Sequence, residues 1–237
     1  MDELPSLVTH AQDLARELGF PLTREEAEPG SASASLPGVG RFLAVLAAGC
    51  SGGLIGELGT GAGIGTAWMA SFMPDDCTLI TAEIDERLAV AVRGLLDGDP
   101  GIAGRVEVIT GDALSTMTGR GQFDLLFADS GVRDQADFGA LVSVLRVGGR
   151  LVMDDVTPVL ALPAPSPLRV SDPKRQLFHG EPRLAWTEVV LPERFGRARS
   201  ACPGRQGRRC ARGSSRTATV GARPSPLWAR AGHPGYG

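Results

Sequence analysis

The sequence predicts an α/β domain built on a doubly wound, mostly parallel sheet. Between residues 54 and 153, short apolar runs alternate with amphipathic stretches of helical period. The run over 123–128 is almost entirely apolar, which is typical of a strand buried on both faces. A chain of 237 residues is long enough to form one such domain with a substantial core.

The N-terminal part is predicted to be helical. Apolar residues recur at helical spacing from Leu4 to Leu18, and a second helix is expected over 39–48. Between these helices, residues 25–34 are polar or small, which is typical of a linker. We therefore expect residues 1–34 to form a helical segment and linker ahead of the main domain.

The central part supplies the sheet. Strands are expected over 54–58, 78–82, 105–109, 123–128 and 150–153, with helices over 64–72, 86–96 and 134–145. A proline-rich loop is expected over 156–173, then a short helix over 174–180 and a sixth strand over 184–191. Strands that alternate with helices favour a parallel sheet with helices on both faces.

The C-terminal tail differs from the rest in composition. Residues 194–237 contain ten arginines and no acidic residue, whereas all 27 acidic residues precede them. Large apolar residues are scarce there and show no period, so a disordered basic tail is expected over 194–237. Nucleic acid is not an expected partner, because aromatic side chains that could stack on bases are nearly absent.

Composition also argues against several classes of protein. No stretch of about 18 apolar residues occurs, so no membrane-spanning helix is expected. The acidic N-terminus lacks the basic start of a secretory signal. The four cysteines are too scattered for a disulfide scaffold or a zinc site. We expect a cytoplasmic protein with no membrane partner.

A glycine cluster follows the first predicted strand. Residues 57–65 have the sequence ELGTGAGIG, where a strand ends and a helix begins. Glycines allow close approach to a ligand, and the following helix offers free N–H groups. The spacing does not fit the G-x-G-x-x-G fingerprint of dinucleotide-binding proteins. An acid two positions before the first glycine suits an ammonium or sulfonium group better than a pyrophosphate.

These motifs resemble those of class I S-adenosylmethionine-dependent methyltransferases, in the O-methyltransferase family related to catechol and caffeoyl-CoA O-methyltransferases. The resemblance covers about residues 35–191 and also rests on segments 81–85, 111–113, 123–129 and 151–155. It implies a Rossmann-like methyltransferase domain over 35–193 that binds S-adenosylmethionine and methylates a small hydroxylated acceptor. The cofactor-binding residues it implies are Glu57, Gly59, Thr60, Gly61, Gly63, Gly65, Glu83, Asp112, Ala113 and Asp129.

Two of these acids have particular roles by the resemblance. Glu83 is implied to bind the ribose hydroxyls, since a carboxylate can accept hydrogen bonds from both. Asp112 is implied to reach the adenine amino group. Each also has a plainer interpretation, Glu83 as a solvated carboxylate and Asp112 as a turn residue after the third strand.

The resemblance also suggests a divalent cation such as Mg²⁺. In metal-dependent members, the positions that match Asp129, Asp154 and Asp155 bind it. The family's lysine base is missing here, because Val132 stands at its position and Arg133 is always protonated. Lys174 is the only lysine of the chain. Metal dependence therefore stays open at this point.

Asp129 is the catalytic candidate, as a general base or as a residue that positions the acceptor. His10 and His179 are alternative bases that no motif supports. Two rival functions also stay open. One is a cofactor-binding protein without catalysis, favoured by the missing lysine. The other is an NAD-type oxidoreductase, disfavoured by the glycine spacing. A homodimer is a further expectation from the N-terminal helix.

The C-terminal end of the chain departs from the pattern of this family. Family members generally close the sheet with a sixth strand and an antiparallel seventh strand. No second apolar strand follows Pro192, because the acid-free composition begins there. The C-terminal strand hairpin is therefore expected to be incomplete, and one hypothesis is that the terminus is altered.

Overall fold

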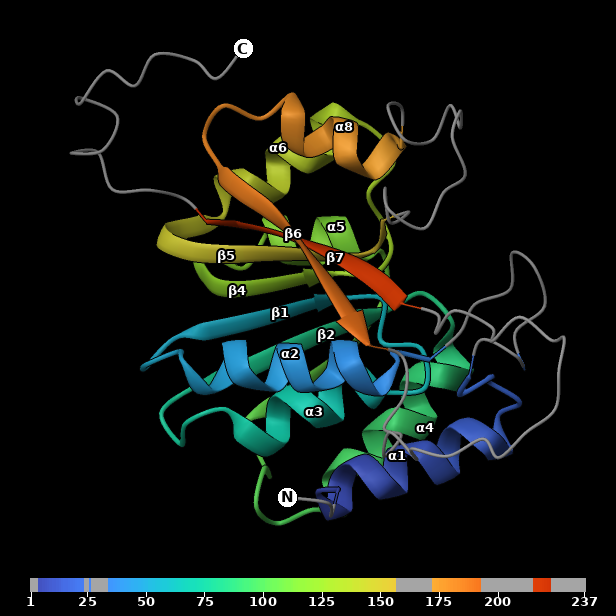
Figure 1. The fold of residues 1–237 in the computed structure, drawn as a ribbon. Coiled ribbons are helices and arrows are strands. Elements are labelled where there is room, and N and C mark those ends of the chain that lie inside the picture. Colours follow the sequence, from blue (N-terminus) through green and yellow to red (C-terminus); the bar gives the residue numbers. More distant parts are fainter. Residues whose placement is uncertain (1–3, 24–25, 27–33, 157–171, 193–214, 223–237) are drawn as a thin grey trace, which may run out of the picture.

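A mixed sheet of seven strands forms the centre of the computed structural model (Figure 1), which describes residues 4–23, 26, 34–156, 172–192 and 215–222. The strand order is β3-β2-β1-β4-β5-β7-β6. The first five strands in this order pair in parallel, whereas β7 is antiparallel to both β5 and β6. The strands are β1 (Leu54–Leu58), β2 (Thr78–Glu83), β3 (Val106–Thr110), β4 (Phe123–Ala128), β5 (Leu145–Val156), β6 (Ala185–Pro192) and β7 (Ser215–Ala222).

Helices cover both faces of this sheet, as a doubly wound fold requires (Figure 1). On one face, the packed helices are α1 (Ser6–Glu17), α2 (Pro37–Ala48), α3 (Ile64–Phe72) and α4 (Glu86–Asp97). On the other face they are α5 (Ala113–Thr118), α6 (Gln135–Ser143) and α8 (Pro173–His179). Each face has its own apolar core, and α1 packs on α3 and α4 within the first of them. The predicted fold class is confirmed.

Capping residues explain where several helices begin. The carboxylates of Asp85, Asp112, Asp134 and Asp172 each accept hydrogen bonds from backbone N–H groups in the first turn of the helix that follows. Such side chains satisfy donors that have no partner within the helix. Asp85 and Asp112 lie at the carboxyl ends of β2 and β3, so these caps also shape the edge of the sheet where ligands bind in open α/β folds.

Most element boundaries differ from the sequence prediction by one or two residues, and the largest differences lie at β5. The helix expected over 134–145 ends at Ser143, and β5 starts at Leu145 and continues through Gly148 and Gly149. A register shift against β4 lies between Phe123 and Leu125, so the glycine pair forms an irregularity within a strand. The short helix α5 was not predicted, because it has too few residues to show a helical period.

The expectation of an incomplete C-terminal hairpin is wrong. Strand β7 lies inside the stretch that was expected to be disordered, and it occupies a central place between β5 and β6. Apart from Val220, its residues are small or polar, which hides it from a search for apolar runs. A Cβ atom at Gly221 would lie 2.9 Å from Leu184 Cδ1, so the packing requires a small residue there. The remainder of 194–237 lies outside the described residues.

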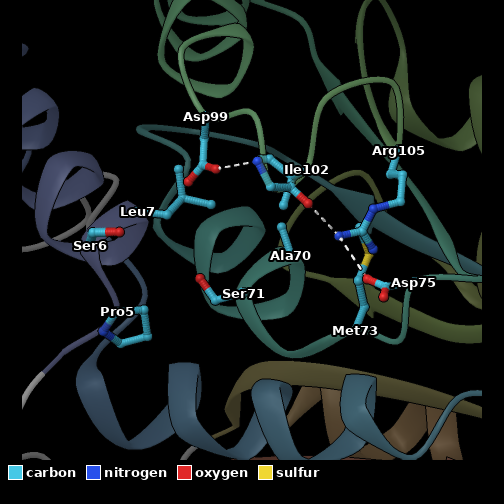
Figure 2. A pocket seen from close by; sticks show the side chains of 11 residues that line it. Pro5, Ser6, Leu7, Ala70, Ser71, Met73, Asp75, Asp99, Ile102 and Arg105 are labelled. Carbon is cyan, nitrogen blue, oxygen red and sulfur yellow. Dashed lines mark hydrogen bonds and ion pairs between the residues drawn. The ribbon is translucent and has the colours of Figure 1, made fainter.

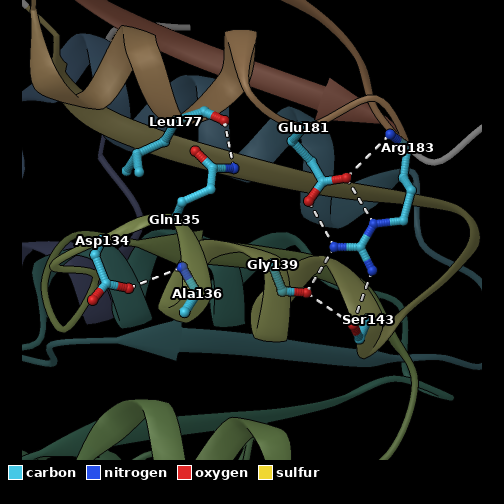
Figure 3. A network of polar contacts seen from close by, with 8 residues as sticks. All are labelled: Asp134, Gln135, Ala136, Gly139, Ser143, Leu177, Glu181 and Arg183. Carbon is cyan, nitrogen blue, oxygen red and sulfur yellow. Dashed lines mark hydrogen bonds and ion pairs between the residues drawn. The ribbon is translucent and has the colours of Figure 1, made fainter.

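A network of polar contacts fixes α8 and the turn after it to α6 (Figure 3). Arg183 donates to Glu181 over 2.6 Å, and to the Gly139 carbonyl and the Ser143 hydroxyl over 3.0 Å each. Gln135 Nε2 donates to the Leu177 carbonyl oxygen over 3.2 Å. The opposite side of α8 is held by an ion pair between the buried Arg175 and Glu188 of β6.

None of the described helices is long and apolar enough to cross a membrane. The predicted boundaries at residues 34 and 193 stay predictions.

Candidate functional site

The glycine loop joins β1 to α3 at the carboxyl edge of the sheet. Gly59, Gly61 and Gly63 have φ values of 90°, 52° and 80°, in the left-handed region that glycine adopts without strain. Gly65 is required for another reason, because a Cβ atom there would collide with Oε1 of Glu57. The predicted turn is thus confirmed. At each of these positions the backbone conformation or the packing favours glycine.

Glu83 ends β2 directly beside this loop. Its Oε2 accepts a hydrogen bond from Gly61 N over 2.8 Å, and its Oε1 accepts one from Asp85 N over 3.0 Å. The residue is only 8% exposed. The solvated-carboxylate interpretation is therefore wrong, because Glu83 is a fixed acceptor that links β2 to the glycine loop.

Glu57 lies behind the loop and is only 1% exposed. Its Oε2 accepts a hydrogen bond from Thr81 Oγ1 over 2.7 Å and a short one from Thr66 Oγ1. Thr81 Oγ1 lies 2.6 Å from Thr60 Oγ1. Burial raises the pKa of Glu57 to about 8, because desolvation outweighs the two hydrogen bonds that lower it.

Asp129 follows β4 and shares a small cavity with the glycine loop. The backbone N–H groups of Asp129 and Ser130 both donate to the Leu58 carbonyl, over 3.1 and 3.0 Å. These bonds hold the end of β4 against the end of β1. The residues that line the cavity are Phe20, Ala34, Ser35, Gly59, Thr60, Gly61, Ala62, Ile64, Gly65 and Asp129.

The N-terminal segment contributes site residues that the sequence analysis missed. Phe20, Ala34 and Ser35 come from the region before β1, part of which was taken as a linker. A Cβ at Gly61 would lie 3.6 Å from Phe20 Cε1, so this ring packs against the loop. Ile84, directly after Glu83, is 79% exposed.

Asp112 and Ala113 lie where β3 passes into α5. Asp112 Oδ1 accepts a hydrogen bond from Ser115 N over 2.8 Å, and this bond holds the pKa of Asp112 below its ordinary value. Gly111 N donates to the Glu83 carbonyl over 2.8 Å, which ties this turn to the end of β2. Asp112 is the N-cap of α5, directly after the third strand, and its role toward adenine stays a prediction.

The predicted metal ligands are not brought together. Within the described ranges, which include Asp129, Asp154 and Asp155, no group of three acidic, histidine or cysteine side chains could hold a metal ion. Asp154 is 1% exposed, and its carboxylate accepts a hydrogen bond from Asp155 N over 2.7 Å. Asp155 is exposed and has a φ of 62°, where the chain bulges out of β5. These three acids therefore do not form a metal-binding group within the described residues, and metal dependence stays a prediction.

Lys174 reaches the same edge from α8. Its Nζ donates to the Asp154 carbonyl oxygen over 2.6 Å. The family's lysine base was taken as missing because Val132 stands at its position. Lys174 lies 45 positions after Asp129 in the sequence, and only the docking of α8 brings it to the end of β5. His179, in contrast, packs edge-on against Trp186 with ring centroids 4.7 Å apart, and His10 is exposed on α1.

A second hollow lies at the opposite, amino edge of the sheet, between α1, α3 and the start of β3 (Figure 2). Its cation, Arg105, donates to the Pro74 carbonyl over 3.1 Å and to the Gly101 carbonyl over 2.7 Å. It also lies 3.6 Å from the Asp75 carboxylate. Because these contacts engage the guanidinium with the protein itself, the hollow has the features of a structural joint rather than of a binding site.

Comparison with known proteins gives consistent findings. Residues 57–156 match a family model described as a methyltransferase domain. A protein of Mycolicibacterium smegmatis with the provisional name O-methyltransferase is 35% identical over 153 residues, which are 62% of this chain and 72% of that protein. A Mycobacterium tuberculosis protein with a similar provisional name is also 35% identical over 153 residues, covering 68% of its length.

Solved structures show the same fold. An O-methyltransferase from Bacillus cereus, crystallised with S-adenosylhomocysteine (SAH), has a TM-score of 0.66 at 21% identity, over 94% of this chain and 93% of that one. The O-methyltransferase TomG from Streptomyces achromogenes, in complex with S-adenosylmethionine (SAM), has a TM-score of 0.65 at 21% identity, over 94% and 92% of the two chains.

Proposed function

Because the chain belongs to the O-methyltransferase family, we propose that it binds SAM at the glycine loop and methylates a hydroxyl oxygen of a small acceptor. The observation that carries the proposal is the position of Glu83. Its carboxylate is fixed by Gly61 N and Asp85 N at the end of β2, beside a loop with three left-handed glycines. Such a carboxylate can accept hydrogen bonds from two vicinal ribose hydroxyls.

The other cofactor contacts are assigned to residues that lie near Glu83 and the glycine loop. Ile84 offers an exposed apolar surface next to Glu83, which suits one face of a planar base. Asp112 lies at the next strand end, tied to β2 through Gly111. The amino-acid part of the cofactor is assigned to the cavity lined by Thr60, Gly61 and Gly65, where the N-terminus of α3 offers N–H groups to a carboxylate.

When bound, SAM supplies an electrophilic methyl group on a sulfonium. Transfer to oxygen is an in-line displacement, so alignment of the two reactants can supply much of the rate enhancement. We assign Asp129 the task of accepting the hydrogen bond of the acceptor hydroxyl and orienting its oxygen. The support is that Asp129 lines the same cavity as the glycine loop. In the described residues the three acids named above do not form a group that could hold a metal ion, so no step is assigned to a divalent cation.

The test is a calorimetric titration of SAH into the full chain, with Glu83→Ala beside it. We expect saturable binding that Glu83→Ala weakens by roughly 100-fold, since charge-assisted hydrogen bonds contribute about 1.5–3 kcal/mol each. Asp85→Ala is the matched control. It removes the cap of α4 and lowers stability by about 1 kcal/mol, but it leaves the ribose acceptor in place.

No SAH binding by a folded wild-type sample would refute the proposed function. Binding of NAD in its place would revive the oxidoreductase alternative. SAH binding without methyl transfer to any of a panel of phenols would favour a binding protein without catalysis. The homodimer and the cytoplasmic location stay predictions.

A further inference from the structure

The carboxyl group of Glu57 is buried, and no cationic side chain of the described residues pairs with it. The groups that face it are Thr66 from α3, Thr81 and Glu83 from β2, and Asp129 from the end of β4. Two of these four are acids. In the described part of the chain, no ion pair joins Glu57 to a lysine, arginine or histidine. A buried carboxylate with acidic neighbours and no cation is costly, so the neutral form is favoured.

The hydroxyls beside Glu57 form a chain that ends at the glycine loop. Thr81 Oγ1 lies 2.7 Å from Glu57 Oε2 and 2.6 Å from Thr60 Oγ1. Each hydroxyl has a single proton to donate. When Glu57 is a carboxylate, Thr81 donates to it, and Thr81 must then accept from Thr60. When Glu57 is neutral, it can donate to Thr81, and Thr60 keeps its own proton for the cavity.

The second carboxyl oxygen of Glu57 points at the start of α3. A Cβ atom at Gly65 would collide with this oxygen, and Gly65 itself lines the cavity. Thr60 and Gly65 thus separate Glu57 from the space assigned to the amino-acid part of the cofactor. A positive charge bound in that space acts on Glu57 through a thin layer of protein, and the burial of Glu57 keeps screening weak.

We propose that Glu57 is a positioning residue that holds a proton while the cofactor site is empty and releases it when a cationic cofactor binds. The inference rests on the proposed function. In this step the O–H bond of the Glu57 carboxyl group breaks, the electron pair stays on the carboxylate, and the proton goes to the buffer. Thr81 and Thr60 reorient their hydroxyls with this change, so the loop presents an acceptor to the cofactor instead of a donor.

The affinity for SAM is expected to depend on pH, because binding lowers the pKa of Glu57. Burial raises the pKa of Glu57 to about 8 in the empty protein, so most molecules hold the proton at pH 7. A bound cation favours the carboxylate and lowers this pKa. SAM affinity should therefore rise with pH up to about 8, by at most tenfold per pH unit, and then level off. SAH lacks the sulfonium charge, so its affinity should rise less.

This difference would favour product release. Methyl transfer removes the positive charge from sulfur, and Glu57 regains its proton from solvent. SAH then binds to a site whose buried acid is neutral again. The ratio of SAM affinity to SAH affinity should therefore be larger at pH 8 than at pH 6.5.

The experiment counts protons by calorimetry. SAM and SAH are titrated into the full chain at pH 7 in phosphate and in Tris, two buffers with different ionisation enthalpies. We expect SAM to release about one proton per site from the wild type, and SAH to release fewer. Glu57→Gln, which resembles the neutral acid in shape, should bind SAM with no release. Glu83→Gln is the matched control, which should weaken binding but keep the release.

Equal heats of binding in the two buffers for the wild type would overturn the inference while leaving the proposed function intact. Proton release by Glu57→Gln equal to that of the wild type would also overturn it. Failure of the folded wild type to bind either ligand would overturn both proposals. Infrared difference spectra need no variant: the carbonyl band of a neutral buried carboxyl group should vanish when SAM binds, and its persistence would overturn the inference.

Discussion

The two halves of the sheet differ in strand direction and in how far apart their paired strands lie in the chain. In the parallel half (β1–β4), buried apolar strands end in loops that hold the glycine motif, Glu83 and Asp129. In the C-terminal half (β5–β7 with α8), the antiparallel strand β7 pairs with β5, more than 60 positions earlier in the chain. The strands of the parallel half could be predicted from apolar runs in the sequence. The C-terminal half is held together by contacts between segments that are distant in the chain.

The hydrophobic pattern of a sequence identifies some strands better than others. A parallel strand with helices on both faces must be apolar almost throughout, so it stands out from its surroundings. Strand β7 packs under α8 and the turn after it, where a Cβ at Gly221 would also lie 3.2 Å from Phe178 Cε1. Close packing there selects a small residue, and Thr219 is fully buried despite its hydroxyl. Small and polar residues can therefore form a central strand when their neighbours are large.

The largest expected effect comes from removing β7. A chain that stops after Pro192 loses the strand between β5 and β6, which leaves two unpaired strand edges in the middle of the sheet. We expect no cooperative thermal unfolding and no SAH binding from this truncation. A chain that stops after Ala222 retains β7 and should unfold like the full chain. If the shorter chain still bound SAH, the parallel half would fold independently of the C-terminal half.

A moderate effect is expected from the ion pair that holds α8. Arg175→Met should lower the free energy of unfolding by about 2 kcal/mol, because it leaves the partly buried Glu188 carboxylate without its partner. The matched control is Arg120→Met in the parallel half, which removes an exposed pair with Glu107 and should cost less than about 1 kcal/mol. Urea unfolding measures both. Equal losses would show that the α8 pair contributes no more than a surface pair.

The smallest effect concerns backbone strain at the end of β5. Asp155 has a φ of 62°, which glycine adopts without strain and alanine does not. Asp155→Gly and Asp155→Ala both remove the carboxylate, so their difference reports the backbone alone. We expect the glycine variant to be more stable by about 1 kcal/mol. Equal unfolding midpoints for the two variants would contradict the left-handed conformation.

The sequence by itself determined the fold class, the strands of the parallel half, the turn at residues 59–63 and the family. These features are local, since each depends on the period of apolar residues or on glycines at a strand end. Glu83 could be predicted as a site residue because its motif follows a predicted strand. The chain order of parallel strands then fixed the edge of the sheet to which it belongs.

Only the tertiary structure decided which side chains meet at that edge. It placed Phe20 and Ser35 against the glycine loop, buried Glu57 behind it, brought Lys174 to Asp154 and kept the three predicted metal ligands from forming a group. It also inserted β7 between β5 and β6. The physical reason is the same in each case. A sequence period shows which face of an element is buried, but the neighbour that buries it is chosen by packing between segments far apart in the chain.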